Sequence, residues 1–228
     1  RGQRGRVELG RIPGGNSYGY RMVHTIQENG EVERGQRDIN EEEAKVIRRI
    51  FSEYVAGINP RKIAASLNKD KIPSPRGGHW NASTINGNRK RRNGILNNEL
   101  YLGRIIYNRQ MFIKNPDTGR RQSRLNPENL WVISNVPELQ IIEKGAWDKA
   151  QAIKLRYSSR RGNKRQTKKR LLSGLIKCGS CGGGMTIVNR ERYSCSARRE
   201  KGICDSPVGI SAQHLEARVI NGLREILL

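Results

Sequence analysis

The cysteines constrain this chain more than any other residue type. All four lie within 27 of the 228 residues, with the spacing C-x2-C-x13-C-x8-C formed by Cys178, Cys181, Cys195 and Cys204. Disulfide pairing would suit a small secreted domain, but nothing in the sequence indicates secretion. A redox CxxC motif is the other alternative, and no βαβ pattern surrounds it. Four thiolates therefore predict one closed, structural Zn²⁺ site, because four protein ligands leave no open position.

The residues around the cysteines predict a small metal-stabilised module. Gly179 and the glycines at 182–184 suit tight knuckles, and residues 185–188 and 192–194 alternate as a hairpin around the turn at 189–191. Arg190 and Arg192 then fall at the hairpin tip. A last helix is predicted after Ser211, with apolar residues on one stripe. In a module of this size, metal binding would supply much of the folding free energy.

The charge balance indicates a polyanionic partner. The chain has 44 Lys and Arg against 21 Asp and Glu, a formal charge of +23. Phosphates relieve the self-repulsion of such a chain. An anionic membrane surface is the competing partner, but we find neither a basic amphipathic helix nor a lipidation signal. Nucleic acid is therefore the favoured partner.

The sequence contains no membrane or secretion signal that we recognise. No apolar run approaches 18 residues, and the first ten residues lack the apolar segment of a secretory signal. We expect no membrane partner. The chain also lacks an initiator methionine, so we expect it to be a piece of a longer protein.

Helix signals dominate the first half of the chain. Asn40 and Glu43 resemble a capping box before a helix whose apolar residues include Ile47, Phe51 and Tyr54, with Gly57 as its stop. Pro60 begins a shorter helix, and Asn81 caps a third segment at 82–85 that the run at 86–88 interrupts. This succession predicts a helix-turn-helix. Strands are predicted around 104–107 and 131–133, a turn at 116–119, and a helix at 143–157.

These elements predict an α+β protein in which a mixed α/β domain containing a helix-turn-helix precedes a small zinc-binding cysteine module. We expect residues 1–15 to be the end of a helix followed by a linker, and 16–157 to be a domain that binds double-stranded DNA. We expect residues 158–170 to be a basic linker, and 171–228 to be the cysteine module with the start of a C-terminal helix. Thirteen extended residues span at most about 43 Å, and one turn of duplex measures roughly 34–36 Å. The linker could therefore carry the ribbon toward the next major groove.

The candidate DNA-contacting residues lie at the predicted recognition helix, in the basic linker and at the ribbon hairpin. Short polar side chains at a recognition helix reach base edges or phosphates, and cations neutralise phosphates. In the first region, Ser83 and Thr84 could instead only cap, and Arg92 could pair with Glu99. The candidates are Ser83, Thr84, Asn86, Arg89, Lys90, Arg91, Arg92, Arg160, Arg161, Lys164, Arg165, Lys168, Lys169, Arg170, Arg190 and Arg192.

We predict no catalytic residue in this chain. His24, His79 and His214 are far apart, and no metal or triad pattern links them. There is no phosphate-binding glycine loop, and acidic residues are too scarce for a two-metal nuclease site. The chain alone is expected to bind and not to catalyse.

Three stretches together resemble the large serine recombinases, the site-specific integrases of phages and mobile elements. These are GRIPGGNSYGYRMV, NASTINGNRKRRNGILNNELYLGRIIYNRQ, and LLSGLIKCGSCGGGM with RYSCSARREKGICDSP. The first two are similar to the family's recombinase domain, and the third to its zinc ribbon. The resemblance implies a serine catalytic domain outside this chain, a long connecting helix that ends within residues 1–15, a backbone-crossing connector at Arg11, and a zinc-ribbon domain at 171–228. It also implies binding of double-stranded DNA at an attachment half-site, and contacts with other recombinase protomers through parts missing here. The expected setting is cytoplasmic and nucleoid-associated, in a protein encoded by a bacterium or a phage.

Two other functions remain open at this stage. An RNA-binding zinc ribbon would offer exposed aromatic residues for base stacking, and aromatics make up only 5% of this chain. A stand-alone DNA repressor would share the charge and the helices but lack a catalytic partner domain. Competition between duplex DNA and RNA separates the first alternative, and the coding sequence before Arg1 separates the second.

Overall fold

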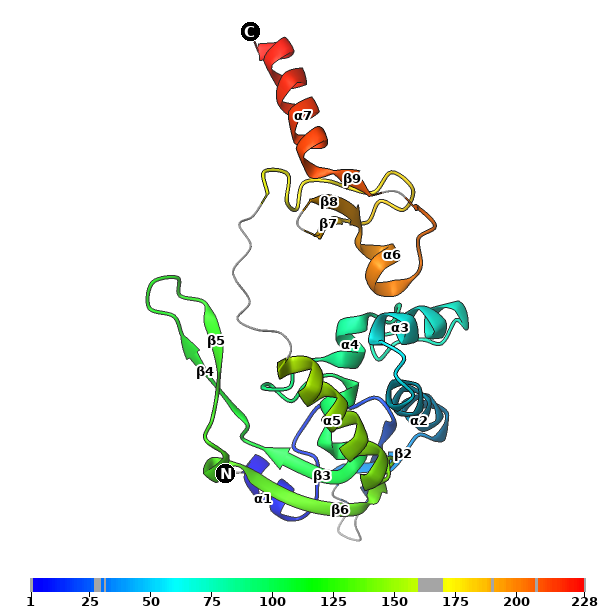
Figure 1. The fold of residues 1–228 in the computed structure, drawn as a ribbon. Helices are drawn as coiled ribbons and strands as arrows, with labels where there is room; N and C mark the ends of the chain where they lie inside the picture. Colours follow the sequence, from blue (N-terminus) through cyan, green and yellow to red (C-terminus); the bar gives the residue numbers. More distant parts are fainter. Residues whose placement is uncertain are drawn as a thin grey trace. The chain divides into compact units, whose positions relative to one another are not determined.

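The computed structural model describes residues 2–26, 30, 32–159, 170–189, 191–207 and 209–227. The chain divides into two compact units (Figure 1). Unit 1 comprises Arg1–Gly57 and Asn86–Lys154, and unit 2 comprises Ile58–Ile85 and Leu155–Leu228.

Unit 1 is built from helices and three separate antiparallel strand pairs, β1 with β2, β3 with β6, and β4 with β5. The helices are α1 (Gly2–Glu8), α2 (Glu41–Val55) and α5 (Lys144–Ser159), and the strands are β1 (Tyr20–Ile26), β2 (Val32–Ile39), β3 (Leu102–Tyr107), β4 (Gln110–Lys114), β5 (Arg121–Leu125) and β6 (Val132–Gln140). Short 3₁₀ turns cover Ile95–Asn97, Glu99–Tyr101 and Glu128–Leu130.

The start of α2 differs in one detail from the predicted capping box. The Asn40 side chain accepts a hydrogen bond from the Glu43 amide, as expected of an N-cap. The reciprocal half of the box is wrong, because the Glu43 carboxylate accepts from the Gly19 amide at 2.6 Å. The Asn40 amide instead donates to the Gly19 carbonyl at 2.9 Å. The cap thus joins α2 to the start of β1, a long-range contact that local spacing does not encode.

Aromatic side chains form the centre of the unit 1 core. Tyr20 stacks on Tyr101 with ring centroids 6.0 Å apart, and Phe51 meets Tyr101 edge-on at 6.4 Å. Phe51 also stacks on Trp147 of α5 at 5.7 Å. These rings come from β1, α2, a 3₁₀ turn and α5, so one cluster joins elements from the whole length of the unit.

In unit 2, α3 (Pro60–Lys69) begins as predicted with Pro60 in its first turn, and the structure adds Asn59 as its N-cap. Asn68 holds the buried Trp80 through both backbone groups, accepting from its amide at 2.7 Å and donating to its carbonyl at 2.9 Å. The single-turn helix α4 (Ala82–Asn86) follows and ends at the boundary between the units. The helix-turn-helix stays a prediction, since α2 and α3 belong to different units.

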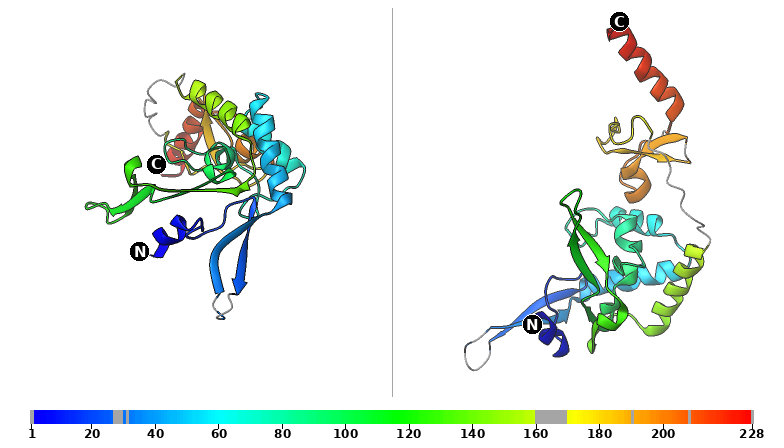
Figure 2. Two further views of the ribbon diagram at one scale, coloured as in Figure 1. Left: turned by 90° about the horizontal axis from the view of Figure 1, so that it is seen from below. Right: turned by 90° about the vertical axis from the view of Figure 1, so that its left-hand side faces the viewer.

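The cysteine-bearing segment is a three-stranded antiparallel sheet with two helices (Figure 2). The strands are β7 (Met185–Val188), β8 (Arg192–Cys195) and β9 (Ile210–Ser211). Helix α6 (Ser196–Lys201) lies between β8 and β9 in the sequence, and α7 (Ala212–Leu227) follows β9. Leu172, Tyr193 and Ala212 form its small buried cluster. The predicted hairpin and final helix are therefore confirmed, and so is the mixed α+β class of the whole chain.

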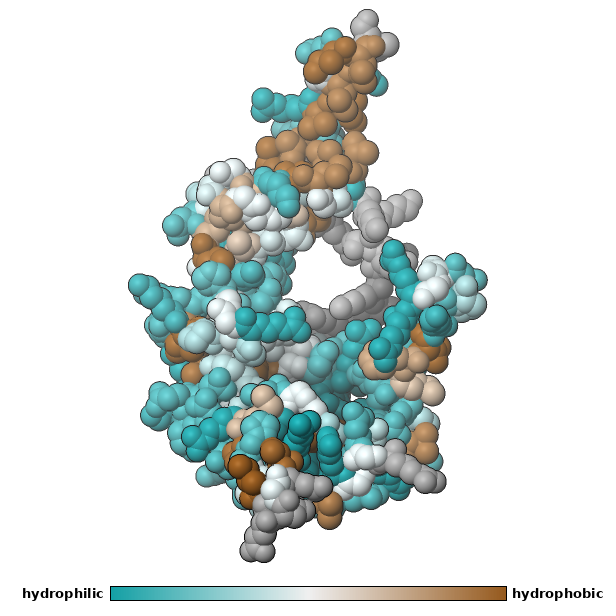
Figure 3. All heavy atoms as spheres, turned by 180° about the vertical axis from the view of Figure 1, so that it is seen from behind, coloured by the Kyte–Doolittle hydropathy of each residue, from teal (hydrophilic) through white to brown (hydrophobic). Residues whose placement is uncertain are grey.

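The final helix leaves its apolar stripe open along most of its length. Leu215 packs near the Tyr193 cluster, whereas Leu223, Ile226 and Leu227 are exposed. Figure 3 shows these apolar side chains gathered along α7. Among the described residues, no helix has the length and apolar character needed to cross a bilayer.

Candidate nucleic-acid interface and metal centre

A tight turn at residues 88–93, the basic turn, follows the end of α4. Asn88 and Asn93, its first and last residues, exchange two backbone hydrogen bonds. The Asn88 amide donates to the Asn93 carbonyl at 3.2 Å, and the Asn93 amide donates to the Asn88 carbonyl at 3.3 Å. The Asn93 side chain also accepts from the Asn88 amide at 2.8 Å, and the Asn88 side chain accepts from the Arg91 amide at 3.1 Å. Asparagine side chains thus close the turn from within, which is their usual role in turns.

The four cations of the basic turn fall into two groups. Arg89, Lys90 and Arg91 are exposed. Arg92 has a left-handed backbone with φ 48° and forms ion pairs with Glu99 and Glu128, so its predicted alternative of pairing with Glu99 is confirmed. Its guanidinium also lies 4.5 Å from the centroid of the Trp131 ring. Arg92 therefore anchors the turn and leaves three cations for a ligand.

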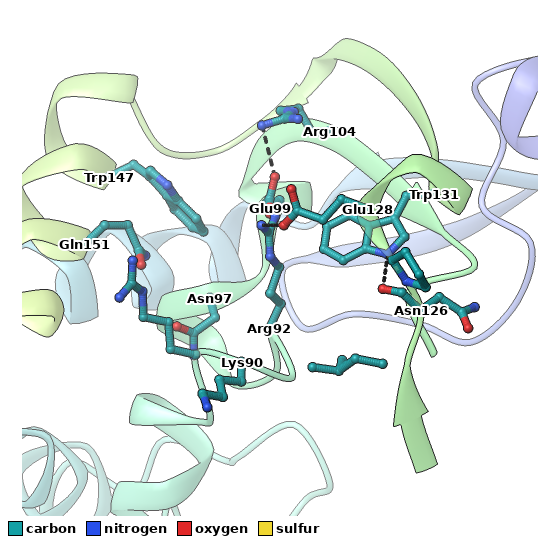
Figure 4. Close-up of a pocket in the computed structure, with 13 residues that line it drawn as sticks. Lys90, Arg92, Asn97, Glu99, Arg104, Asn126, Glu128, Trp131, Trp147 and Gln151 are labelled. Atoms are coloured by element: carbon teal, nitrogen blue, oxygen red, sulfur yellow. Dashed lines mark hydrogen bonds and ion pairs between the residues drawn. The ribbon is translucent and has the colours of Figure 1, made fainter. Parts of the chain in front are cut away.

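A cavity of about 580 Å³ lies beside the basic turn (Figure 4). Glu99 is buried in its wall between Arg92 and Arg104, with 3.0 Å to the Arg104 guanidinium. The second carboxylate, Glu128, lies 3.0 Å from Arg92. Both carboxylates that line the cavity are thus paired with arginine, and they fix Arg92 in place. The full lining is Arg89, Lys90, Arg92, Asn97, Glu99, Arg104, Leu125, Asn126, Pro127, Glu128, Trp131, Trp147 and Gln151.

Two buried donors support the basic turn from the protein side. The Asn86 carbonyl, the last of α4, accepts from the Asn97 side chain at 2.9 Å and from the Lys154 ammonium. Asn97 also donates to the Asn93 carbonyl at 2.6 Å, so one amide joins the end of α4 to the end of the turn. Burial lowers the pKa of Lys154 to about 8, and the charge of Arg89 adds to this effect.

The β4–β5 hairpin supplies exposed cations that sequence reasoning did not select. Lys114, Arg120, Arg121 and Arg124 are all exposed on it. The sequence predicted the turn at 116–119 but gave no role to the flanking cations. The available signal was the excess of basic over acidic residues around that turn, four against one in residues 110–125.

The other predicted DNA-contacting residues are scattered. Ser83 is exposed and Thr84 half-buried in unit 2, whereas Asn86 belongs to unit 1 with the basic turn. Arg11 is half-buried in unit 1. Arg170 lies 3.8 Å from Glu216, and exposed Arg192 donates to the Gly209 carbonyl. Arg160, Arg161, Lys164, Arg165, Lys168, Lys169 and Arg190 lie outside the described residues.

The four cysteine sulfurs converge on one point in unit 2. Their Sγ atoms all lie within 4.8 Å of one another, with 3.9 Å between Cys178 and Cys204 and 3.5 Å between Cys181 and Cys195. A disulfide would need about 2.05 Å. Tetrahedral bonds of about 2.3 Å to one Zn²⁺ would place sulfurs about 3.8 Å apart. Backbone amides of Cys181 and Ser180 point at Cys178 and lower the pKa of its thiol to about 6. The arrangement is compatible with one structural metal site.

Two family models cover most of the chain. The model described as Recombinase matches residues 41–156, and the Recombinase zinc beta ribbon domain matches residues 171–224. The chain belongs to the recombinase family. The resemblance seen in the sequence is thereby confirmed.

A Bacillus subtilis (strain 168) protein named "Putative DNA recombinase" is 27% identical over 186 residues. The match covers 77% of this chain and 34% of that protein, so this chain spans about a third of the relative's length. Two solved structures are also similar, each with 20% identity and a TM-score of 0.42. "Crystal Structure of a LSR-DNA Complex" is matched over 98% of this chain and 64% of that one. "Sequence Requirements of the Listeria innocua prophage attP site" is matched over 100% and 86%.

We predict that Gly87→Ala destabilises unit 1 and displaces the basic turn. Gly87 has φ +57°, and an added Cβ would lie 1.7 Å from the Asn93 carbonyl oxygen. Left-handed backbone alone costs an alanine about 1–2 kcal/mol, and the backbone clash adds to that cost. Urea unfolding measures the loss. Gly119→Ala is the matched control, because Gly119 has φ +64° and open space around its Cβ position. Equal losses in the two variants would contradict the close packing of Gly87.

We also predict that Lys154 makes the stability of unit 1 depend on pH. The folded state releases the Lys154 proton at lower pH than the unfolded chain does. As the pH rises from about 8 towards the ordinary lysine pKa of 10.5, the wild type therefore gains stability relative to Lys154→Met. Chemical unfolding at several pH values tests this. Lys149→Met, at an exposed position of the same helix, should run parallel to the wild type. Parallel curves for wild type and Lys154→Met would show that the ammonium is not desolvated.

Proposed function

We propose that this chain binds double-stranded DNA in a sequence-specific manner at a recombination attachment half-site. It would serve as the DNA-recognition part of a serine site-specific recombinase. The observation that carries the proposal is the basic turn, where Arg89, Lys90 and Arg91 are exposed on a backbone held by Asn97 and Lys154. A rigid display of cations and short polar groups suits a ligand with fixed geometry. Membership of the recombinase family and the charge of +23 support it.

The proposed mechanism assigns base recognition and phosphate binding to different residues. Ser83, Thr84 and Asn86 on α4 reach base edges, together with Arg89, whose guanidinium suits guanine. Lys90 and Arg91 neutralise neighbouring phosphates and set the register. Arg92 acts indirectly, because Glu99 and Glu128 engage its guanidinium. Arg11 and Arg192 are proposed backbone contacts at the connector and at the ribbon.

In this proposal two DNA-binding lobes, joined by a linker, contact the same duplex. We propose that 1–15 is the connector, 16–157 the first DNA-binding lobe, 158–170 a strap along the backbone, and 171–228 the second lobe. The strap's Arg160, Arg161, Lys164, Arg165, Lys168, Lys169 and Arg170, with Arg190 of the ribbon, complete the proposed contact set. Serine chemistry and contacts with other recombinase protomers are proposed for segments outside these 228 residues. A DNA partner would place the protein in the cytoplasm with the nucleoid.

We further propose that Cys178, Cys181, Cys195 and Cys204 hold one Zn²⁺. The chemistry of the donor set fits, since clustered thiolates select soft or borderline metals. With four protein ligands the ion has a structural role. The cluster joins residues before β7, at the end of β8 and after α6, and it therefore replaces the large core that this module lacks.

The readers and the strap should respond differently to mutation. Asn86→Ala or Arg89→Ala should reduce discrimination between the preferred duplex and a random one by about 1–3 kcal/mol per lost base contact. Neutralising Arg160, Arg161, Lys164 and Arg165 should weaken binding to all duplexes and flatten the dependence on salt. Fluorescence anisotropy at several salt concentrations, with RNA as competitor, measures both. If the two classes of variant behave alike, the assignment of base recognition and phosphate binding to different residues is wrong.

Metal removal should unfold the cysteine-bearing module. Purified chain should contain one Zn²⁺ per molecule, and chelation or Cys195→Ser should abolish the β7–β8 hairpin, because its folding free energy comes largely from the metal. Elemental analysis and NMR of the β8 amides check this. Ser180→Ala is the control from the same loop and should keep both metal and hairpin. A metal-free chain with oxidised sulfurs would rule the site out.

A further inference from the structure

The β4–β5 hairpin has no buried face. Each of its ten strand residues is at least partly exposed, and Met111 and Phe112 expose 51% and 54% of their surface. Ile113 and Leu125 are exposed as well. A two-stranded ribbon gains little stability from its backbone bonds alone, so apolar residues on both of its faces are not explained by its own folding.

The charge of the hairpin favours an anionic partner. Residues 110–125 contain four basic residues and one acidic residue. The strand register places Phe112, Lys114 and Arg121 on one face, and Met111, Ile113 and Arg124 on the other. Both faces therefore combine a cation with apolar surface. The Arg121 guanidinium lies 4.1 Å from the centroid of the Phe112 ring, which orients the guanidinium along the ribbon.

The hairpin is stiffened at its tip and at its base. At the tip, the Asn115 side chain accepts from the amides of Asp117 and Thr118, both at 2.9 Å. At the base, the Asn126 side chain donates to the Asn108 carbonyl at 2.8 Å, and the Trp131 indole donates to the Asn126 carbonyl at 3.1 Å. A ribbon held at both ends can present its cations at fixed spacing.

Hydrogen bonds join the base of the hairpin to the basic turn. Arg109 donates to the Arg92 carbonyl at 3.1 Å, and Gln110 donates to the Arg91 carbonyl at 3.4 Å. Both segments belong to unit 1. The base of the hairpin is therefore fixed to the basic turn, and both segments expose cations.

We propose that the β4–β5 hairpin is a second DNA-contacting element, which lies in the major groove of the duplex that the basic turn reads. This inference rests on the proposed function and extends it. A two-stranded antiparallel ribbon fits the major groove, about 12 Å wide. Arg121 and Arg124 then meet phosphates or guanine edges from opposite faces, while Phe112 and Met111 contact thymine methyl groups and sugars. A protein partner would need one contiguous apolar face, whereas here both faces carry cations.

The test compares two pairs of charge deletions in the same unit. Duplexes are first selected from a random library by the wild-type chain. Arg121→Ala/Arg124→Ala should make the negative slope of log K against log salt shallower by about 2, which is about 1 per lost phosphate contact. It should also remove a block of guanine N7 protections against dimethyl sulfate, which reports on the major groove. Lys144→Ala/Lys149→Ala, at exposed positions of α5, should keep that block of protections. Arg121→Lys/Arg124→Lys should restore the salt slope.

The outcomes separate this inference from the proposed function. If the wild-type chain selects no duplex, the proposed function fails and takes the inference with it. If the wild type binds and Arg121→Ala/Arg124→Ala keeps its affinity and its protections, the inference alone fails. A variant that binds normally but changes the oligomeric state assigns the hairpin to a protein interface and also overturns the inference. Circular dichroism and thermal melting confirm that the variants are folded.

Discussion

One backbone carbonyl, that of Asn86, governs the geometry of the candidate DNA interface. It ends a helix of a single turn, too short to hold itself in place by its own hydrogen bonds. Asn97 and Lys154 provide the missing constraint from 11 and 68 residues further along the chain. Since Asn97 also holds the Asn93 carbonyl, the entry and the exit of the basic turn are fixed to the same side chain. The orientation of Arg89, Lys90 and Arg91 follows from that support.

The acidic residues near this surface explain how so basic a chain keeps a defined structure there. Glu99 is buried and pairs with Arg92 and Arg104, and Glu128 pairs with Arg92 as well. A buried carboxylate is costly without compensating charge, and the two guanidinium groups supply that charge to Glu99. Glu99 and Glu128 therefore pair with arginines that shape the surface, and they leave Arg89, Lys90 and Arg91 exposed for a ligand.

Local signals in the sequence predicted much of this structure. Asn40, Pro60 and Gly57 mark helix ends because caps depend on neighbours in the chain, and the four cysteines indicated their cluster because metal ligands have few alternatives. The long-range contacts were not predictable in this way. The Glu43 carboxylate reaches Gly19, and Lys154 reaches Asn86, across separations that no periodicity records. The cations of β4 and β5 were overlooked because charge on a strand has no spacing that distinguishes binding from solvation.

The position of Lys154 has a consequence for how this fold could be shortened or recombined with others. The turn that carries Arg89, Lys90 and Arg91 ends at residue 93, but one of its two supporting donors, Lys154, lies on α5. A fragment that ends before this helix would keep every proposed reading residue and lose the donor that orients them. Grafting the loop onto another scaffold would therefore transfer its sequence without its conformation. Exchanges of DNA specificity between relatives should replace the whole segment from the loop through α5.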